Sequence, residues 1–123
     1  ARSEALKRNQ PVIICRSTNG TDCAGAGNWE GGWMTYADLD ADGAKDAAEP
    51  IIAVHQRLAK ADTLRVTAPA LQDRIRYNPD GTASAPGVFV VCNRDQDTSL
   101  AREVELSVTG RPYLRRTTSN CLP

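Results

Sequence analysis

The sequence predicts an α+β fold: one helix at the start of the chain, followed by a run of antiparallel strands. Good helix formers fill Ala1 to Asn9, and from Val12 onward the apolar residues come in short, β-branched runs. Gly, Pro, Asn and Asp separate these runs, as is typical of turns between strands. The length of 123 residues is that of one ordinary domain. We therefore expect a single α+β domain.

Each expected element follows from a local pattern. Ala1, Ala5 and Leu6 lie along one side of the predicted helix, which Pro11 ends. Turns are expected at Asn78 to Gly81 and at Thr109-Gly110. Runs rich in β-branched or alternating residues predict strands at Val12 to Cys15, Trp29 to Ala37 (broken at Gly31 and Gly32), Pro50 to Val54, Thr63 to Thr67, Arg74 to Tyr77, Gly87 to Cys92, Glu103 to Val108 and near Tyr113-Leu114.

The overall charge excludes a general attraction to nucleic acid or anionic lipid. Fifteen Lys and Arg balance fifteen Asp and Glu, so the formal net charge is zero. The longest apolar stretches are Val12 to Cys15 and Val88 to Cys92. Both fall far short of the roughly 20 residues that a membrane-spanning helix needs. Binding to a polyanion would have to come from a local cluster of basic residues.

Four scattered cysteines favour disulfides in an oxidising compartment. None of them forms a CxxC motif, and the one histidine, His55, does not complete a zinc finger of the usual spacing. Four cysteines permit three pairings. We favour Cys15 with Cys23, which close a short polar loop, and Cys92 with Cys121, which tie down the C-terminal tail; the alternative is four buried thiols in a cytosolic core.

An acidic segment has the spacing of a calcium loop. It matches D-x-D-x-D-G followed by five residues and Glu, the pattern of the loop of about 12 residues in EF-hands. Lys45 and the absence of flanking helices count against calcium, and the plain alternative is a solvated connection between strands. So many carboxylates need a counter-charge, which is either Ca²⁺ or nearby arginines. The candidate ligands are Asp38, Asp40, Asp42, Ala44 (through its carbonyl), Asp46 and Glu49, with Gly43 at the sharp turn.

The C-terminal segment is locally basic. Residues 107–123 contain Arg111, Arg115 and Arg116 and no acidic side chain. In a strand, Arg111, Tyr113 and Arg115 would share one face, a row that fits phosphates and offers one ring for stacking. The alternative interpretation is an edge strand that charge protects from pairing with other chains.

No catalytic set is visible in the sequence. A single histidine is present, and we find no Gly-x-Ser-x-Gly motif, phosphate-cradling loop or Cys/His pair. We therefore expect no enzyme activity. Trp29 and Trp33 are expected to anchor the core, because the chain has few other aromatic residues.

An ordered set of motifs resembles the GspH/FimT family of minor pilins and pseudopilins. The resemblance covers essentially the whole chain. Its pieces are ARSEALKRNQPVIIC, the Cys15 to Cys23 loop, W-x-x-G-W (Trp29, Gly32, Trp33), Asp38-Leu39-Asp40-Ala41-Asp42-Gly43 ending in Glu49-Pro50-Ile51-Ile52, Tyr77-Asn78-Pro79-Asp80-Gly81-Thr82-Ala83 and Val108-Thr109-Gly110-Arg111.

The resemblance implies a type IV pilin-like head: residues 1–10 are the end of the long N-terminal helix, and residues 11–123 form the globular β-rich head. It also implies a subunit of a type IV pilus, or alternatively a GspH-like pseudopilin of type II secretion. The protein would be anchored in the inner membrane of a Gram-negative bacterium by the part of the helix that precedes residue 1. Its head would lie in the periplasm or on the filament, and its partners would be other pilins or pseudopilins.

Some FimT-like members bind DNA during natural transformation through a Gly-Arg-x-Arg element. Gly110 and Arg111 match this element, but Tyr113 stands where the second Arg would be. The resemblance therefore supports a DNA-binding set of Gly110, Arg111, Tyr113, Arg115 and Arg116 only in part. It supplies no metal site, so the calcium hypothesis depends on the acidic motif alone.

Overall fold

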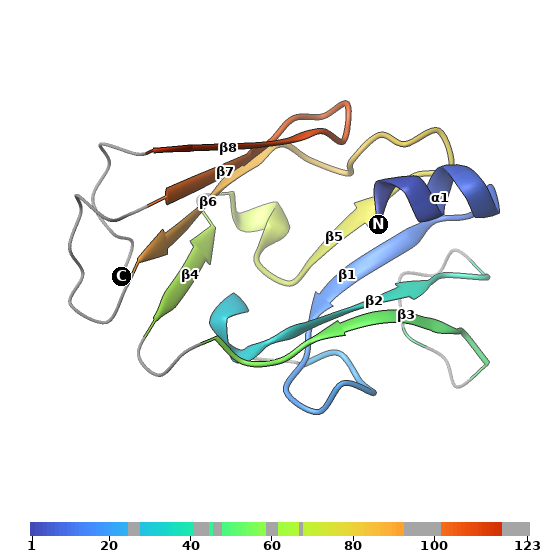
Figure 1. The fold of residues 1–123 in the computed structure, drawn as a ribbon. Helices are drawn as coiled ribbons and strands as arrows, with labels where there is room; N and C mark the ends of the chain where they lie inside the picture. Colours follow the sequence, from blue (N-terminus) through green and yellow to red (C-terminus); the bar gives the residue numbers. More distant parts are fainter. Residues whose placement is uncertain are drawn as a thin grey trace.

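The computed structural model describes residues 1–24, 28–40, 45, 48–58, 62–66, 68–92 and 102–116. In these residues one α-helix precedes eight strands, which form two antiparallel sheets (Figure 1). This confirms the predicted α+β fold. The elements in chain order are α1 (Arg2–Arg8), β1 (Val12–Arg16), the 3₁₀ turn η1 (Trp29–Gly31), β2 (Trp33–Ala37), β3 (Ile51–His55), β4 (Thr63–Val66), the 3₁₀ turn η2 (Pro69–Leu71), β5 (Arg74–Tyr77), β6 (Gly87–Cys92), β7 (Arg102–Leu106) and β8 (Pro112–Arg116).

Helix α1 ends where the chain turns into the first sheet. Its C-cap, Asn9, adopts a left-handed conformation (φ 52°), which asparagine tolerates better than most residues. Ala5 is fully buried, while Glu4 and Arg8 form an ion pair one helical turn apart on the exposed side. Within the described residues no helix is long and apolar enough to cross a membrane.

The first sheet has the strand order β3-β2-β1-β5. Strand β1 lies between two partners and is buried on both faces, which explains its continuous apolar run Val12, Ile13, Ile14 and Cys15. Ile13 pairs with Tyr36 of β2 on one side and with Arg76 of β5 on the other. Strand β3 forms the outer edge, and its pairing with β2 contains a register shift between Thr35 and Tyr36.

The second sheet has the strand order β4-β6-β7-β8. Strand β6 (GVFVVC) lies inside it, as its apolar composition predicts, and pairs with β4 and β7. In β7, Glu103 and Glu105 alternate with Val104 and Leu106, so that apolar residues of this strand share one face. Strand β8 forms the outer edge beyond β7.

Trp29 joins the two sheets. Its indole N–H donates to the carbonyl of Leu71 at 3.1 Å, and its ring packs edge to face against Phe89 of β6, with 5.7 Å between ring centroids. The prediction that Trp29 begins a strand is therefore wrong: residues Trp29–Gly31 form a 3₁₀ turn. Gly32 has φ 112°, and a Cβ there would lie only 2.8 Å from the Ser17 carbonyl oxygen. Because glycine has no Cβ, the backbone can bend at this position, and the bend after η1 leaves Trp29 in the core.

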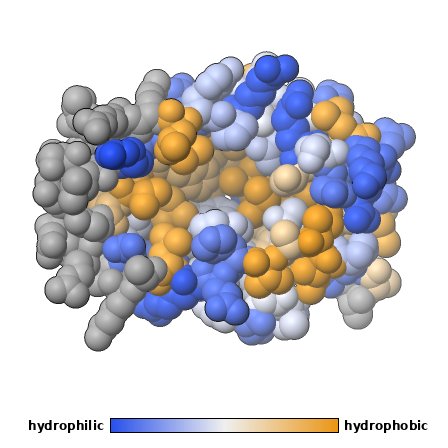
Figure 2. Space-filling model, in the orientation of Figure 1, coloured by the Kyte–Doolittle hydropathy of each residue, from blue (hydrophilic) through white to orange (hydrophobic). Residues whose placement is uncertain are grey.

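An apolar groove of about 430 Å³ opens between the two sheets. Figure 2 shows apolar side chains inside the hollow at the centre of the molecule. Both sheets supply its walls, and the first residue of the chain lies at its rim. The lining residues are Ala1, Ile14, Trp29, Trp33, Leu64, Ile75, Tyr77, Phe89, Val91, Val104, Leu106 and Pro112.

Candidate functional site

The acidic connection is the segment 38–49, which leads from β2 to β3. Its two ends are buried: Asp38 is 0% and Glu49 is 4% exposed. The Asp38 backbone N–H donates to the Pro11 carbonyl at 2.9 Å. A Glu49 carboxylate oxygen accepts the backbone N–H of Leu39 at 2.7 Å. These contacts hold both carboxylates at the end of the first sheet.

Three carboxylates of the acidic connection converge. Oxygen atoms of Asp38, Asp40 and Glu49 all lie within 4.8 Å of one another. The Arg76 guanidinium of β5 lies 4.0 Å from Asp38 Oδ2 and supplies part of the counter-charge. The other predicted ligands, Asp42, Ala44 and Asp46, lie outside the described residues, as does Gly43. Oxygen ligands at this separation suit a hard cation such as Ca²⁺, and calcium binding stays a prediction.

One predicted disulfide is present, and the other lies partly outside the described residues. Cys15 and Cys23 are bonded, with 5.6 Å between their Cα atoms. The bond closes the loop that follows β1, and Ser17 supports this loop by accepting the Gly20 N–H and donating to the Asp22 carbonyl. Cys92, at the end of β6, is buried and disulfide-bonded. Cys121 lies outside the described residues.

The predicted basic residues are brought together along β8. Arg111 precedes the strand, which begins at Pro112, and Tyr113 is 54% exposed. Arg115 and Arg116 complete the backbone of β8, where they pair with Glu103 and Arg102 of β7. Tyr113 pairs with Glu105. The neighbouring strand thus places two carboxylates beside the basic one, which lowers the local positive charge.

Gly110 has a packing role that the sequence does not reveal. It is buried, has φ 87°, and a Cβ at this position would lie 2.0 Å from the Gly81 carbonyl oxygen. The β7–β8 turn therefore packs directly against the turn after β5. The predicted turn residues hint at this bend, but no local pattern predicts that the two turns meet.

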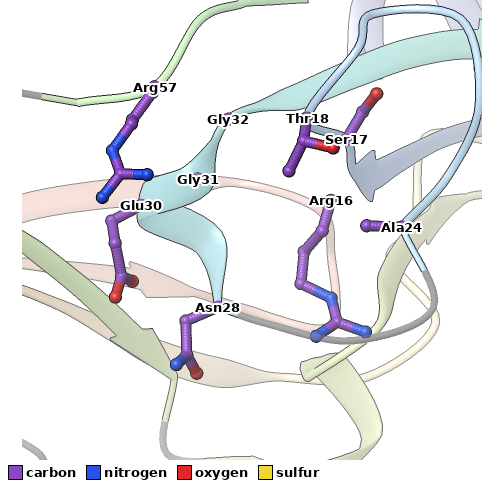
Figure 3. Close-up of a pocket in the computed structure, with 9 residues that line it drawn as sticks. All are labelled: Arg16, Ser17, Thr18, Ala24, Asn28, Glu30, Gly31, Gly32 and Arg57. Atoms are coloured by element: carbon purple, nitrogen blue, oxygen red, sulfur yellow. The ribbon is translucent and has the colours of Figure 1, made fainter.

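A small polar pocket lies beside the disulfide loop (Figure 3). It measures about 230 Å³ and contains Arg16 at one side and Arg57 at the other, with Glu30 and Asn28 between them. The Arg16 side chain is nearly buried and donates to Asp73 at 2.5 Å. Glu30 accepts from the Arg65 guanidinium and from the Leu64 N–H. No local sequence pattern predicts this pocket, because its residues come from segments far apart in the chain.

Comparisons with known proteins identify relatives of the chain. A family model described as type II transport protein GspH matches residues 1–110. Crystal structures of the type IV minor pilin FimU from Pseudomonas aeruginosa match with TM-scores of 0.70 and 0.72, at 19% and 20% identity; they cover 98% of this chain and 86% and 81% of theirs. The minor pseudopilin EpsH from the type 2 secretion system of Vibrio cholerae matches with a TM-score of 0.63 at 10% identity, covering 96% of this chain and 86% of its own. A search of curated protein sequences finds no match.

Proposed function

This chain belongs to the GspH family of minor pilins and pseudopilins, and we propose that it is a FimT-like minor pilin that takes part in assembling a type IV pilus. The family consists of structural filament subunits in Gram-negative bacteria, anchored in the membrane with a periplasmic head. In the proposal the head described above contacts other pilins. The helix that α1 would continue toward the N-terminus anchors the protein in the inner membrane.

The observation that carries the proposal is the family match, which spans residues 1–110. The likeness in fold to FimU exceeds the likeness to EpsH and favours the pilus over the secretion system. The arginines at positions 111, 115 and 116 point the same way, because a local excess of positive charge suits a filament that meets DNA.

A deletion strain separates the two systems. We expect loss of surface pili and of natural transformation, with exoprotein secretion unchanged, and recovery when the full-length gene is supplied in trans. Loss of secretion with intact pili would instead assign the protein to the type II pseudopilus. The amount of an outer-membrane protein that belongs to neither system serves as the control for general envelope damage.

DNA binding at β8 is the second part of the proposal. Arg111 and Tyr113 are exposed, and the backbone of β8 continues through Arg115 and Arg116. Arginines contact phosphates, and an exposed ring stacks on bases of single-stranded DNA. With few contacts and the nearby Glu103 and Glu105, affinity should be weak and should fall steeply with salt.

Mobility-shift titrations at low and moderate salt test this. The Arg111/Arg115/Arg116 triple alanine variant should bind DNA more weakly. Its plot of log affinity against log salt should also be less steep, by up to about 3 in the magnitude of the slope. The matched control is the Lys7/Arg57/Arg74 triple alanine variant, which removes the same charge from exposed positions outside β8. Equal retention of DNA by both variants would refute DNA binding through β8 and leave the role in pilus assembly untouched.

A further inference from the structure

The loop closed by the Cys15–Cys23 bond contains an Asn-Gly pair, Asn19 and Gly20. In such a pair the backbone nitrogen of the glycine can attack the side-chain carbonyl carbon of the asparagine. The attack is faster before glycine than before other residues, because glycine has no Cβ to obstruct the approach and its backbone turns freely. Among all the asparagines of the sequence, Asn19 alone precedes a glycine. The loop therefore contains the asparagine of this chain that is most open to such a reaction.

The fold requires glycine at position 20. Gly20 has φ 76°, in the left-handed region, and a Cβ there would lie 3.2 Å from Val54 Cγ1 of β3. A larger residue would slow the attack on Asn19, but it would be strained at this backbone conformation and crowded against Val54. Asn19 itself is exposed, so that water reaches it. The packing of the loop on the first sheet therefore keeps a reactive pair in place.

Hydrogen bonds hold both reacting groups of the pair. The Gly20 N–H donates to Ser17 Oγ at 3.0 Å, so the attacking nitrogen is engaged. Asn19 Oδ1 accepts the backbone N–H groups of Thr21 and Asp22, each at 2.9 Å, which fixes the side-chain amide. The Ser17 hydroxyl in turn donates to the Asp22 carbonyl at 2.7 Å. The attack thus requires these bonds to break and the loop to open.

We propose that Asn19 is a modification site that the folded loop protects, and that it is converted to aspartate or isoaspartate once the loop opens. In the open loop the Gly20 nitrogen bonds to Asn19 Cγ and gives up its proton. The bond from Cγ to the side-chain nitrogen breaks, and that nitrogen leaves as ammonia with the proton. Water then opens the resulting succinimide at either of its two carbonyl carbons. One water is consumed and one ammonia is released, and neither an oxidant nor a cofactor is needed.

The Cys15–Cys23 bond controls how often the loop opens. Cys15 lies in β1 and is buried, and the Ala24 N–H donates to the Arg16 carbonyl at 2.6 Å, so that both ends of the loop are attached to the first sheet. A cross-link between the ends of a segment removes many of its open conformations. A chain in which this bond has not formed should therefore convert Asn19 faster. The modification would mark heads that lack the disulfide.

Conversion would also alter the surface beside the loop. Asn19 lines a cavity of about 380 Å³ that Val54 and Arg57 also line, so a carboxylate at position 19 adds a negative charge there. The Asn19 amide nitrogen now lies 3.4 Å from an Asp22 carboxylate oxygen, and a second carboxylate in its place would be repelled. Isoaspartate lengthens the backbone as well, which would move Gly20 from its place against Val54. The product should therefore hold the loop less well than asparagine does.

Mass spectrometry of peptides, after incubation of the folded protein at neutral pH, measures the conversion as the mass gained when an amide NH₂ becomes OH. Ser17→Ala removes the acceptor of the Gly20 N–H. It should speed conversion of Asn19 about fivefold, the change in open population that the loss of one hydrogen bond produces. Thr18→Ala is the matched control, because it removes an exposed hydroxyl one residue along the loop and leaves the Ser17 contact in place. It should convert like the unmodified chain.

The Cys15→Ala, Cys23→Ala double variant tests control by the disulfide and should convert Asn19 at least as fast as Ser17→Ala does. Asn78 is the internal reference in every sample: it precedes Pro79, which has no backbone N–H to attack, and should stay unchanged. Circular dichroism checks that the variants fold, and the comparison of Ser17→Ala with Thr18→Ala decides the matter if the cysteine variant does not. Conversion in the unmodified chain as fast as in either folded variant would overturn the proposal.

Discussion

The acidic connection and the basic strand β8 carry opposite charges, and the fold treats those charges in opposite ways. At the acidic connection the ends, Asp38 and Glu49, are buried and bound to backbone or to Arg76. At β8, Arg111 and Tyr113 are exposed at the outer edge of a sheet. A charge that the fold buries must be compensated within the molecule or by a bound ion, whereas an exposed charge remains available to a partner.

The largest expected effect is at the turn that positions the basic strand. Gly110→Ala places a Cβ 2.0 Å from the Gly81 carbonyl oxygen at a backbone with φ 87°. We expect a loss of at least about 3 kcal/mol in the free energy of unfolding, measured by urea denaturation. The control is Gly31→Ala, whose Cβ would meet Thr18 at an ordinary 3.7 Å and should cost little. Equal stability of both variants would show that the two turns do not pack as described.

Adding Ca²⁺ to chelator-treated protein tests whether the acidic connection binds an ion. If it does, calorimetry on chelator-treated protein should show binding heat, and about 100 times Kd of Ca²⁺ should stabilise the fold by about 2.7 kcal/mol. Asp40→Asn should weaken binding roughly tenfold, because it removes one charged ligand. Asp80→Asn, at an exposed carboxylate elsewhere, should not. No heat and an unchanged melting temperature would leave arginines such as Arg76 as the counter-charge.

A smaller effect is expected at Glu30, whose compensating cation is identified. Burial raises the pKa of Glu30, but the hydrogen bonds from Arg65 and the Leu64 N–H outweigh it and hold the pKa below the ordinary 4.5. The ionised Glu30 carboxylate therefore stabilises the folded state above pH 4.5, and this stabilisation is lost as the pH falls through the lowered pKa.

Glu30→Gln should lose about 1–2 kcal/mol at neutral pH and remove this acid dependence from the unfolding free energy. Denaturation curves between pH 7 and pH 3 measure it, because this range includes the ordinary pKa of 4.5 and the lowered pKa lies below that value. Glu4→Gln is the control: its pKa is also lowered, first by the hydrogen bond from Arg8, but this i,i+4 ion pair lies on the solvent-facing side of α1, so the free energy of unfolding should hardly change. An acid dependence that persists in Glu30→Gln would contradict the assignment.

The smallest effect on stability is expected for Arg111→Ala. Arg111 is exposed and precedes β8, so its removal should change the unfolding free energy by less than about 0.5 kcal/mol. Thermal denaturation checks this alongside the DNA titration. A large loss of stability would mean that the charge serves the fold and would remove the contrast between the two regions.

The sequence predicts the strands well where local pattern decides them. Val12 to Cys15 and Gly87 to Cys92 are recognisable because strands buried on both faces read as continuous apolar runs. The observed end of a strand differs from the predicted one where a contact with a residue distant in sequence sets the boundary. Strand β3 runs to His55, one residue beyond the prediction, and His55 stacks on Trp33 with 4.2 Å between ring centroids.

The candidate site is predictable only in part, for the same reason. The spacing of Asp38, Asp40 and Glu49 in the sequence indicates a common centre, and their oxygens do converge. Arg76 as a neighbour of Asp38 follows from the pairing of β5 with β1, which no motif encodes. The contact between Gly110 and Gly81, and the placement of Glu103 and Glu105 beside the basic strand, also arise only when distant segments pair.

The central place of β1 has a mechanical consequence. Helix α1 leads directly into β1, which is hydrogen-bonded to β2 on one side and to β5 on the other. A force applied at α1 would reach the first sheet through β1, and releasing β1 requires the hydrogen bonds of both ladders to break. The Cys15–Cys23 bond then limits how far the strand can be drawn out before a covalent link bears the force. The central strand of the first sheet, rather than an edge strand, therefore takes a force that enters through the helix.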